Sequence, residues 1–148
     1  MVLRGSITLA LAAVLAAVDL AHKAAAEIPW WAYHVRSGAW ELLAAGLVVG
    51  CVGLTRIPSA SVAAAAGILA GGATGNLVSS LRSDEGVPNP IFFRDDKVVI
   101  AFNLADIFTL AGIGALMVTL VSTTIRHRAQ LLPPRAFASM LWRRLRSR

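Results

Sequence analysis

Charged residues and metal-ligating residues are both scarce in this sequence. Asp, Glu, Lys and Arg together make up 15% of its residues, and only 8 residues are acidic. The single cysteine, Cys51, excludes an intramolecular disulfide, and we expect it to fill a small apolar space inside a helix. The three histidines (His22, His34 and His127) show no ligand spacing, so the sequence predicts neither a metal site nor a cofactor.

Apolar residues are abundant instead. They account for 57% of the chain, far more than a soluble domain needs for its core. A helix needs about 20 apolar residues to cross a membrane, and about 17 at the least. The stretches that meet this length are Leu3–Leu20, Ala39–Thr55, Ile57–Val78 and Val98–Ile125. The sequence therefore predicts an all-α integral membrane protein with four transmembrane helices. A soluble bundle is disfavoured because no polar faces accompany so much Ala, Val and Leu.

The net charge of +6 does not indicate nucleic-acid binding, because the positive charge is concentrated in one segment. Half of the 14 cationic residues follow the last apolar stretch: Arg126, Arg128, Arg135, Arg143, Arg144, Arg146 and Arg148. The positive-inside rule places this segment in the cytoplasm, and an even number of spans places the N-terminus there too. We expect a membrane domain, residues 1–125, and a basic amphipathic tail, residues 126–148, that either lies on the inner leaflet or stays solvated.

The N-terminal stretch also has the three parts of a secretory signal peptide, namely a basic residue, an apolar run and small residues near a cleavage region. Asp19, His22 and Lys23 lie in that region, where charged and polar groups do not suit cleavage. We therefore expect an uncleaved first span.

The connections His22–Gly38 and Arg82–Lys97 are expected on the outer face of the membrane as irregular loops. The second contains Gly86, Pro88 and Pro90, which exclude a regular helix. Both connections carry aromatic residues that suit a membrane interface: Trp30, Trp31, Tyr33, Phe92 and Phe93.

Small residues recur at every fourth position of the third stretch: Ala63, Gly67, Gly71 and Gly75. On a helix they form one smooth stripe. Such a stripe either packs closely against another span or gives a substrate access to the backbone.

Ionisable and amide side chains inside the apolar stretches are the main candidates for function, because burying them in a membrane is costly. Asp19 and Lys23 lie one helical turn apart at the end of the first span. Asn76 lies near the outer end of the third span, and Asn103 and Asp106 share one face at the start of the fourth. These residues converge at one membrane depth, either as a site or as a hydrogen-bond network that holds the helices together.

With these motifs the chain resembles the bacterial lipoprotein signal peptidases, also called signal peptidase II, a family of aspartic endopeptidases with four spans. Asp19-Leu-Ala-His-Lys23 matches the family's Asp-x-x-x-Lys at the end of span one. Gly71-Gly-Ala-Thr-Gly75-Asn76 matches its Gly-Ala-x-Gly-Asn stretch, and Phe102-Asn103-Leu-Ala-Asp106 matches its Phe-Asn-x-Ala-Asp. The resemblance covers essentially the whole chain and implies the bacterial cytoplasmic (inner) membrane, with both termini in the cytoplasm.

The chain departs from the family at three places. Ser79-Ser80 stands where the family has an Asp-Arg pair whose Asp is catalytic. The second motif, Asn-x-Gly-Ala, is reduced to Arg36-Ser-Gly-Ala39. The family's Gly-x-Val-x-Asp-Phe stretch reads Gly86-Val-Pro-Asn-Pro-Ile91, so that its Asp is also missing.

The resemblance implies a mechanism in which two carboxylates flank one water, one as the base and the other as the acid. Asp106 matches one carboxylate, and Ser79 replaces the other, although a hydroxyl cannot alternate between charged base and neutral acid. Residues that would replace the missing carboxylate are Asp19, Asp84, Asp95 and Asp96. Residues that the resemblance assigns to binding or support are Asp19, Lys23, Arg36, Gly75, Asn76 and Asn103.

Three functional hypotheses follow. In the first, the protein is a catalytically impaired relative of signal peptidase II that binds membrane lipid, a lipoprotein precursor's signal segment or a partner protein's transmembrane helix. In the second, it is an active aspartic endopeptidase that uses Asp106 and a non-standard second carboxylate to cleave lipoprotein signal peptides. In the third, it is a structural subunit of a larger membrane complex. None of them involves nucleic acid.

Overall fold

The protein folds into a bundle of helices, as a computed structural model of residues 1–95, 99–130, 142–143 and 146 shows. The helices are α1 (Val2–Ala25), α2 (Gly38–Gly53), α3 (Ala60–Arg82) and α4 (Leu104–Arg126), and a short 3-10 helix, η2 (Leu54–Arg56), continues α2. Within the described residues, four helices, α2 with its η2 extension included, are long and apolar enough to cross a membrane. The prediction of four long apolar helices is confirmed, and these helices indicate a multi-pass membrane protein.

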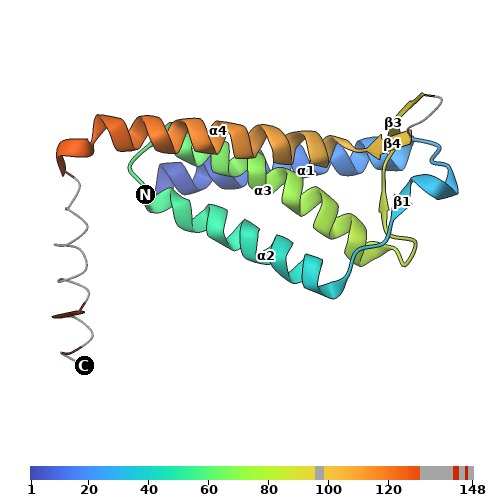
Figure 1. Ribbon diagram of the computed structural model, residues 1–148, viewed down its shortest axis with the longest axis horizontal. Coiled ribbons are helices and arrows are strands. Elements are labelled where there is room, and N and C mark those ends of the chain that lie inside the picture. Colours follow the sequence, from blue (N-terminus) through green and yellow to red (C-terminus); the bar gives the residue numbers. More distant parts are fainter. Residues whose placement is uncertain (96–98, 131–141, 144–145, 147–148) are drawn as a thin grey trace.

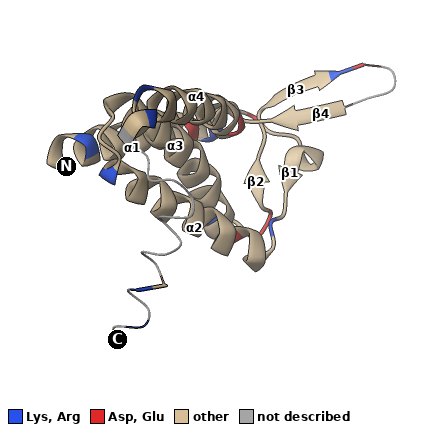
Figure 2. Ribbon diagram, turned by 60° about the vertical axis from the view of Figure 1, so that its left-hand side comes forward, with Lys and Arg blue, Asp and Glu red and all other residues tan. Residues whose placement is uncertain are grey.

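The central element is α3, which packs against all three other helices, while α2 and α4 have no substantial contact with each other. Figure 1 shows α2 diverging from α4 toward the end of the bundle that carries the strands. The start of α1 and the end of α4 lie at the opposite end. Among the described residues, Asp and Glu lie toward the strands, whereas Lys and Arg lie at both ends (Figure 2).

Close packing against α3 explains the stripe of small residues. A Cβ atom added at Gly67 would lie 2.9 Å from the Cβ of Leu11 in α1, and one at Gly71 would lie 2.8 Å from the Cβ of Leu15. A Cβ at Gly72, beside the stripe, would lie 2.5 Å from the carbonyl oxygen of Ala105 in α4. Neighbouring helices therefore cover the backbone that a substrate would otherwise reach, and helix packing is the role of the stripe.

The helix boundaries differ from the predicted spans at two places that matter for the site. Helix α1 ends at Ala25 rather than Leu20, so that Asp19 and Lys23 both lie inside it. Helix α4 begins at Leu104 rather than Val98, because Val99–Phe102 is a strand. Asn103 is the N-cap of α4, and its side chain accepts a hydrogen bond from the backbone N–H of Asp106.

The prediction of irregular outer loops is wrong in part, because both connections contain short strands. Strands β1 (Tyr33–His34) and β2 (Val87–Pro88) pair antiparallel, and β3 (Ile91–Arg94) pairs antiparallel with β4 (Val99–Phe102). A 3-10 helix, η1 (Trp30–Ala32), precedes β1. Short apolar runs such as these carry too little periodicity to distinguish a strand from the start of a helix. The described residues of the second connection that follow α3 contain no regular helix, as predicted.

The tail begins with a 3-10 helix, η3 (Arg128–Gln130). Most of the predicted basic amphipathic segment, residues 126–148, lies outside the described residues. Asp96, one of the candidate replacement carboxylates, also lies outside them.

Candidate functional site

The helix ends nearest the strands bring five of the predicted site residues together. Asp19 and Lys23 come from α1, Asn76 and Ser79 from α3, and Asp106 from the first turn of α4. Hydrogen bonds and one ion pair connect them without interruption. The convergence expected from three separate spans is therefore observed.

Lys23 is the centre of this network. Its Nζ atom lies 2.7 Å from Asp19 Oδ2, 2.9 Å from Asn76 Oδ1 and 3.1 Å from Ser79 Oγ. These contacts use all three donors of the ammonium group. Lys23 is 6% exposed and Asp19 is fully buried, so the ion pair is almost entirely covered by protein.

Asp19 also joins α1 to α4. Its Oδ1 atom accepts a hydrogen bond of 2.8 Å from the backbone N–H of Ala105. Ala105 lies in the first helical turn, where the backbone N–H has no partner within its own helix. A carboxylate at this end also interacts favourably with the helix dipole. Asp19 and Lys23 therefore form a structural clamp between helices.

The orientation of the Asn76 amide follows from its partners. Lys23 can only donate and an ionised Asp106 can only accept, so Asn76 presents its oxygen to Lys23 and its Nδ2 to Asp106. The Asn76 Nδ2 to Asp106 Oδ1 distance is 2.8 Å. Gly75 gives Asp19 its space, because a Cβ atom at that position would lie 2.6 Å from Asp19 Oδ2.

Asp106 is held by a capping box. Its Oδ2 atom accepts a hydrogen bond of 3.1 Å from the backbone N–H of Asn103, and its own N–H donates to Asn103 Oδ1 at 3.0 Å. Asn103 is fully buried. The carboxylate thus stays fixed at the start of α4 while retaining free lone pairs.

Sequence analysis missed two residues that support Asn103. Asn103 Nδ2 donates to Asn89 Oδ1 at 2.6 Å, and Asn89 Nδ2 lies 3.0 Å from His34 Nδ1. Since Asn89 must donate here, His34 accepts through Nδ1 and carries its proton on Nε2. Asn89 is fully buried where the connection between α3 and α4 meets the connection between α1 and α2. The signal in the sequence was Asn89 itself, which lies in the stretch where signal peptidase II, the family that the chain resembles, carries an aspartate.

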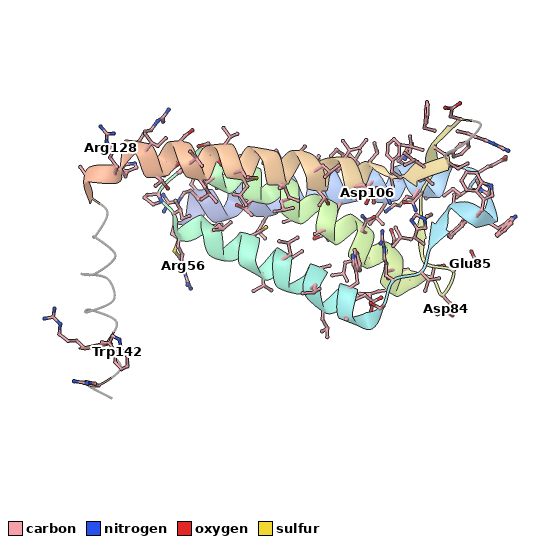
Figure 3. All side chains as sticks on the ribbon, in the orientation of Figure 1. Arg56, Asp84, Glu85, Asp106, Arg128 and Trp142 are labelled. Atoms are coloured by element: carbon pink, nitrogen blue, oxygen red, sulfur yellow. The ribbon has the colours of Figure 1, made fainter. Side chains whose placement is uncertain are left out.

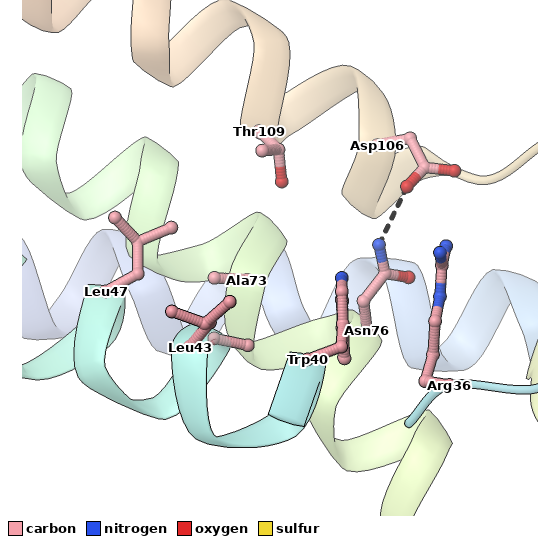
Figure 4. A pocket seen from close by; sticks show the side chains of 9 residues that line it. Arg36, Trp40, Leu43, Leu47, Ala73, Asn76, Asp106 and Thr109 are labelled. Atoms are coloured by element: carbon pink, nitrogen blue, oxygen red, sulfur yellow. Dashed lines mark hydrogen bonds between the residues drawn. The ribbon is translucent and has the colours of Figure 1, made fainter. Parts of the chain in front are cut away.

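A groove of about 340 Å³ opens beside Asp106 between α2, α3 and α4. Figure 4 shows polar side chains at one end and apolar side chains at the other. The polar end is formed by Arg36, Asn76, Asp106 and Thr109, and the remaining lining residues are Trp40, Leu43, Ala44, Leu47 and Ala73. Arg36, just before α2, stacks its guanidinium on the Trp40 ring at 4.9 Å.

Ser79 does not line this groove. It lines a second cavity of about 270 Å³ together with Lys23. Its hydroxyl accepts from Lys23 and donates to the carbonyl oxygen of Gly75 at 2.9 Å. An activated serine would instead give its proton to a neutral base. The neighbouring Ser80 donates to Glu41 of α2 at 2.8 Å.

The other candidate carboxylates lie away from the groove. Asp19 is bonded to Lys23 and Ala105, and Asp84 is exposed in the turn after α3 (Figure 3). Asp95 is exposed at the end of β3. Of the described residues that line the groove, Asp106 alone carries a carboxylate. No group of three or more His, Cys, Asp or Glu side chains in the described part of the chain is arranged to hold a metal ion.

No known protein-family model matches this chain. No curated protein matches it significantly. The fold and the site therefore define a multi-pass membrane protein with a buried polar network and a groove between its helices.

Proposed function

We propose that this protein is a relative of signal peptidase II that binds a lipid or lipidated ligand in the groove beside Asp106 and does not cleave it. The single observation that carries this proposal is the composition of the groove. It has an apolar wall and one carboxylate, Asp106, among its described lining residues, while position 79 belongs to another cavity.

The contacts among the motif residues support the kinship. Asp19 and Lys23 from the first motif, Asn76 from the third and Asp106 from the fourth bond to one another. Motifs that are far apart in the sequence and carry a family resemblance are expected to meet in space if they serve one site. The proposal includes the bacterial cytoplasmic membrane, with both termini in the cytoplasm. Among the described residues, the end where α1 begins carries cationic side chains and no acidic ones, which supports that orientation.

A single carboxylate limits what the groove can do to a peptide bond. An aspartic peptidase needs one carboxylate as base and one carboxylic acid to polarise the carbonyl group. Asp106 can serve only one of these roles at a time. Loss of a general acid or base costs about 10²- to 10⁴-fold in rate. The second hypothesis, an active peptidase, would require another carboxylate to enter the groove from a segment such as the one that contains Asp96.

The shape of the groove supports an apolar ligand. Leu43 is 75% exposed and Leu47 is 41% exposed on the wall formed by α2. Because α2 diverges from α4, this wall is open sideways toward the hydrocarbon region. An acyl chain could enter from the bilayer without leaving the apolar phase.

The third hypothesis, a structural subunit, explains the buried clamp of Asp19 and Lys23 but not the groove. Polar residues that serve only to hold helices together are expected to satisfy one another. Arg36 instead points its guanidinium into the groove, where its Nε atom is buried without a hydrogen-bond partner in the described structure. A binding function accounts for both features.

Photo-crosslinking with a lipid that carries a photoreactive acyl chain tests the proposal. We expect the purified protein to be labelled on α2 and α4 at the groove. The Leu47→Trp variant should lose most of this labelling, because the larger ring fills the groove. Leu42→Trp is the matched control, since Leu42 is a 77% exposed residue of α2 that does not line the groove. Equal labelling of both variants would overturn the proposal.

A further inference from the structure

The polar end of the groove carries one cation and one anion, neither of which has an ion-pair partner among the described residues. Among the described residues, Lys23 and Asp19 neutralise each other. Neither Arg36 nor Asp106 forms an ion pair with another described residue, although both line the same groove. Burial of a charge near an apolar region is costly unless it is paired. A ligand that supplies both missing counter-charges would therefore be favoured.

Arg36 is arranged to receive an anion. Its guanidinium stacks on Trp40 and stands at the polar end of the groove, as Figure 4 shows. Its Nε atom is buried and has no acceptor in the described structure. A guanidinium offers five donors in a planar fork that matches a phosphate or carboxylate. The unused donors identify the position of an incoming anionic group.

Asp106 is arranged to receive a cation. An ionised carboxylate has about four lone-pair sites, and Asn76 and the Asn103 backbone use two of them. Both of these partners are neutral groups. The remaining lone pairs can accept hydrogen bonds from an ammonium group at the polar end.

The apolar wall begins where these charges end. Leu43, Ala44 and Leu47 follow one another along α2, and Ala73 lies opposite them on α3. The polar end lies where α2 and α4 begin, and the apolar wall leads toward the middle of the bundle. A lipid whose head group lies at the polar end and whose acyl chain lies along the apolar wall would match this arrangement of the groove.

We infer that the ligand of this groove is a zwitterionic phospholipid with a primary amine, whose phosphate binds Arg36, whose ammonium binds Asp106 and whose acyl chain lies along α2. This inference rests on the proposed function and names its ligand. An anionic lipid would bind Arg36 but leave Asp106 unpaired and repelled. The neutral diacylglyceryl group of a lipoprotein precursor would leave both charges unpaired. A choline head group has no N–H to donate to Asp106.

Lipid retention by the full-length protein tests the inference. The protein is placed in nanodiscs with equal parts of phosphatidylethanolamine, phosphatidylglycerol and phosphatidylcholine, and the retained lipid is identified by native mass spectrometry after release. We expect phosphatidylethanolamine to be retained about tenfold over both others, the preference expected from one charge-assisted hydrogen bond. Arg36→Gln should remove most retention. Asp106→Asn should shift the preference toward phosphatidylglycerol.

Arg82→Gln is the matched control, because Arg82 is an exposed cation at the same end of the bundle that does not line the groove. Its lipid preference should equal that of the parent. Arg36→Gln is the decisive variant, since Arg36 holds no helix end, whereas Asp106 caps α4. Retention without head-group preference would overturn the inference and leave the proposed function standing. The same conclusion would follow if a lipidated precursor displaced phosphatidylethanolamine and bound the Arg36→Gln variant as well as it binds the parent protein. If the acyl-chain probe does not label the groove of the parent protein, both the inference and the proposed function are overturned.

Discussion

Lys23 donates a hydrogen bond of 3.1 Å to the hydroxyl of Ser79, at the position where the resemblance to signal peptidase II calls for a catalytic carboxylate. Lys23 is itself neutralised by Asp19 in the same helix. The hydroxyl therefore completes the coordination of the ammonium group without adding charge. Because Ser79 accepts this hydrogen bond, the buried Lys23 has a full set of partners without a second carboxylate at position 79.

Removing the cation should destabilise the protein more than any surface change. We expect Lys23→Met to lower the free energy of unfolding by about 3–5 kcal/mol, because it leaves Asp19 as an unpaired buried charge. Denaturant unfolding in detergent measures the effect. The double variant Asp19→Asn with Lys23→Met should recover part of the loss. An unaffected single variant would show that the pair does not hold α1 to its neighbours.

The close contact between α3 and α4 provides a matched pair of glycines. A Cβ atom at Gly112 would lie 2.5 Å from Leu69 Cα, whereas one at Gly114 would meet nothing within 4 Å. We expect Gly112→Ala to cost about 1–3 kcal/mol through overpacking. Gly114→Ala should have no such cost. Equal thermal stability of the two variants would contradict the observed packing.

Asn89 should prove to be a structural residue that joins the connection between α1 and α2 to the connection between α3 and α4. Asn89→Ala leaves the Asn103 amide and His34 without their shared partner, and unpaired buried polar groups cost about 1–3 kcal/mol. Thermal unfolding, compared with that of Asp84→Ala in the same connection, measures this cost. Asp84 is exposed and should tolerate alanine. If both variants unfold at the same temperature, the Asn89 contacts do not contribute to stability.

Placing the aspartate of signal peptidase II at position 79 should not give the protein peptidase activity. We expect Ser79→Asp to show no cleavage above the level of the inactive Asp106→Asn variant, because position 79 faces Lys23 and a separate cavity. Incubation with a lipidated precursor and gel analysis provide the measurement. Cleavage by Ser79→Asp would show that positions 79 and 106 can act on one substrate.

The sequence predicts the helices well because their signal is strong. Apolar runs of this length have few alternative structures, and the polar residues Asp19, Asn76 and Asp106 interrupt them at equivalent depths. The strands were not predicted, because β3 and β4 each contain only 4 residues. Such runs acquire their structure from pairing with each other, which no local pattern reveals.

The candidate site was predicted as a cluster but not as two separate cavities. The sequence predicts that Asp19, Asn76 and Asp106 lie at one depth, and contacts through Lys23 connect them. Which side of Asn76 each residue faces depends on how α1, α2 and α4 pack around α3. The role of Arg36 depends on its stacking against Trp40, a contact made by the loop before α2.

Incubation of the purified parent protein with a diacylglyceryl-modified lipoprotein precursor tests the central claim most directly. The account predicts that the precursor remains intact at enzyme-to-substrate ratios where an authentic signal peptidase II cleaves it completely. Specific cleavage at the lipidated cysteine that disappears in the Asp106→Asn variant would contradict the account and identify a working peptidase.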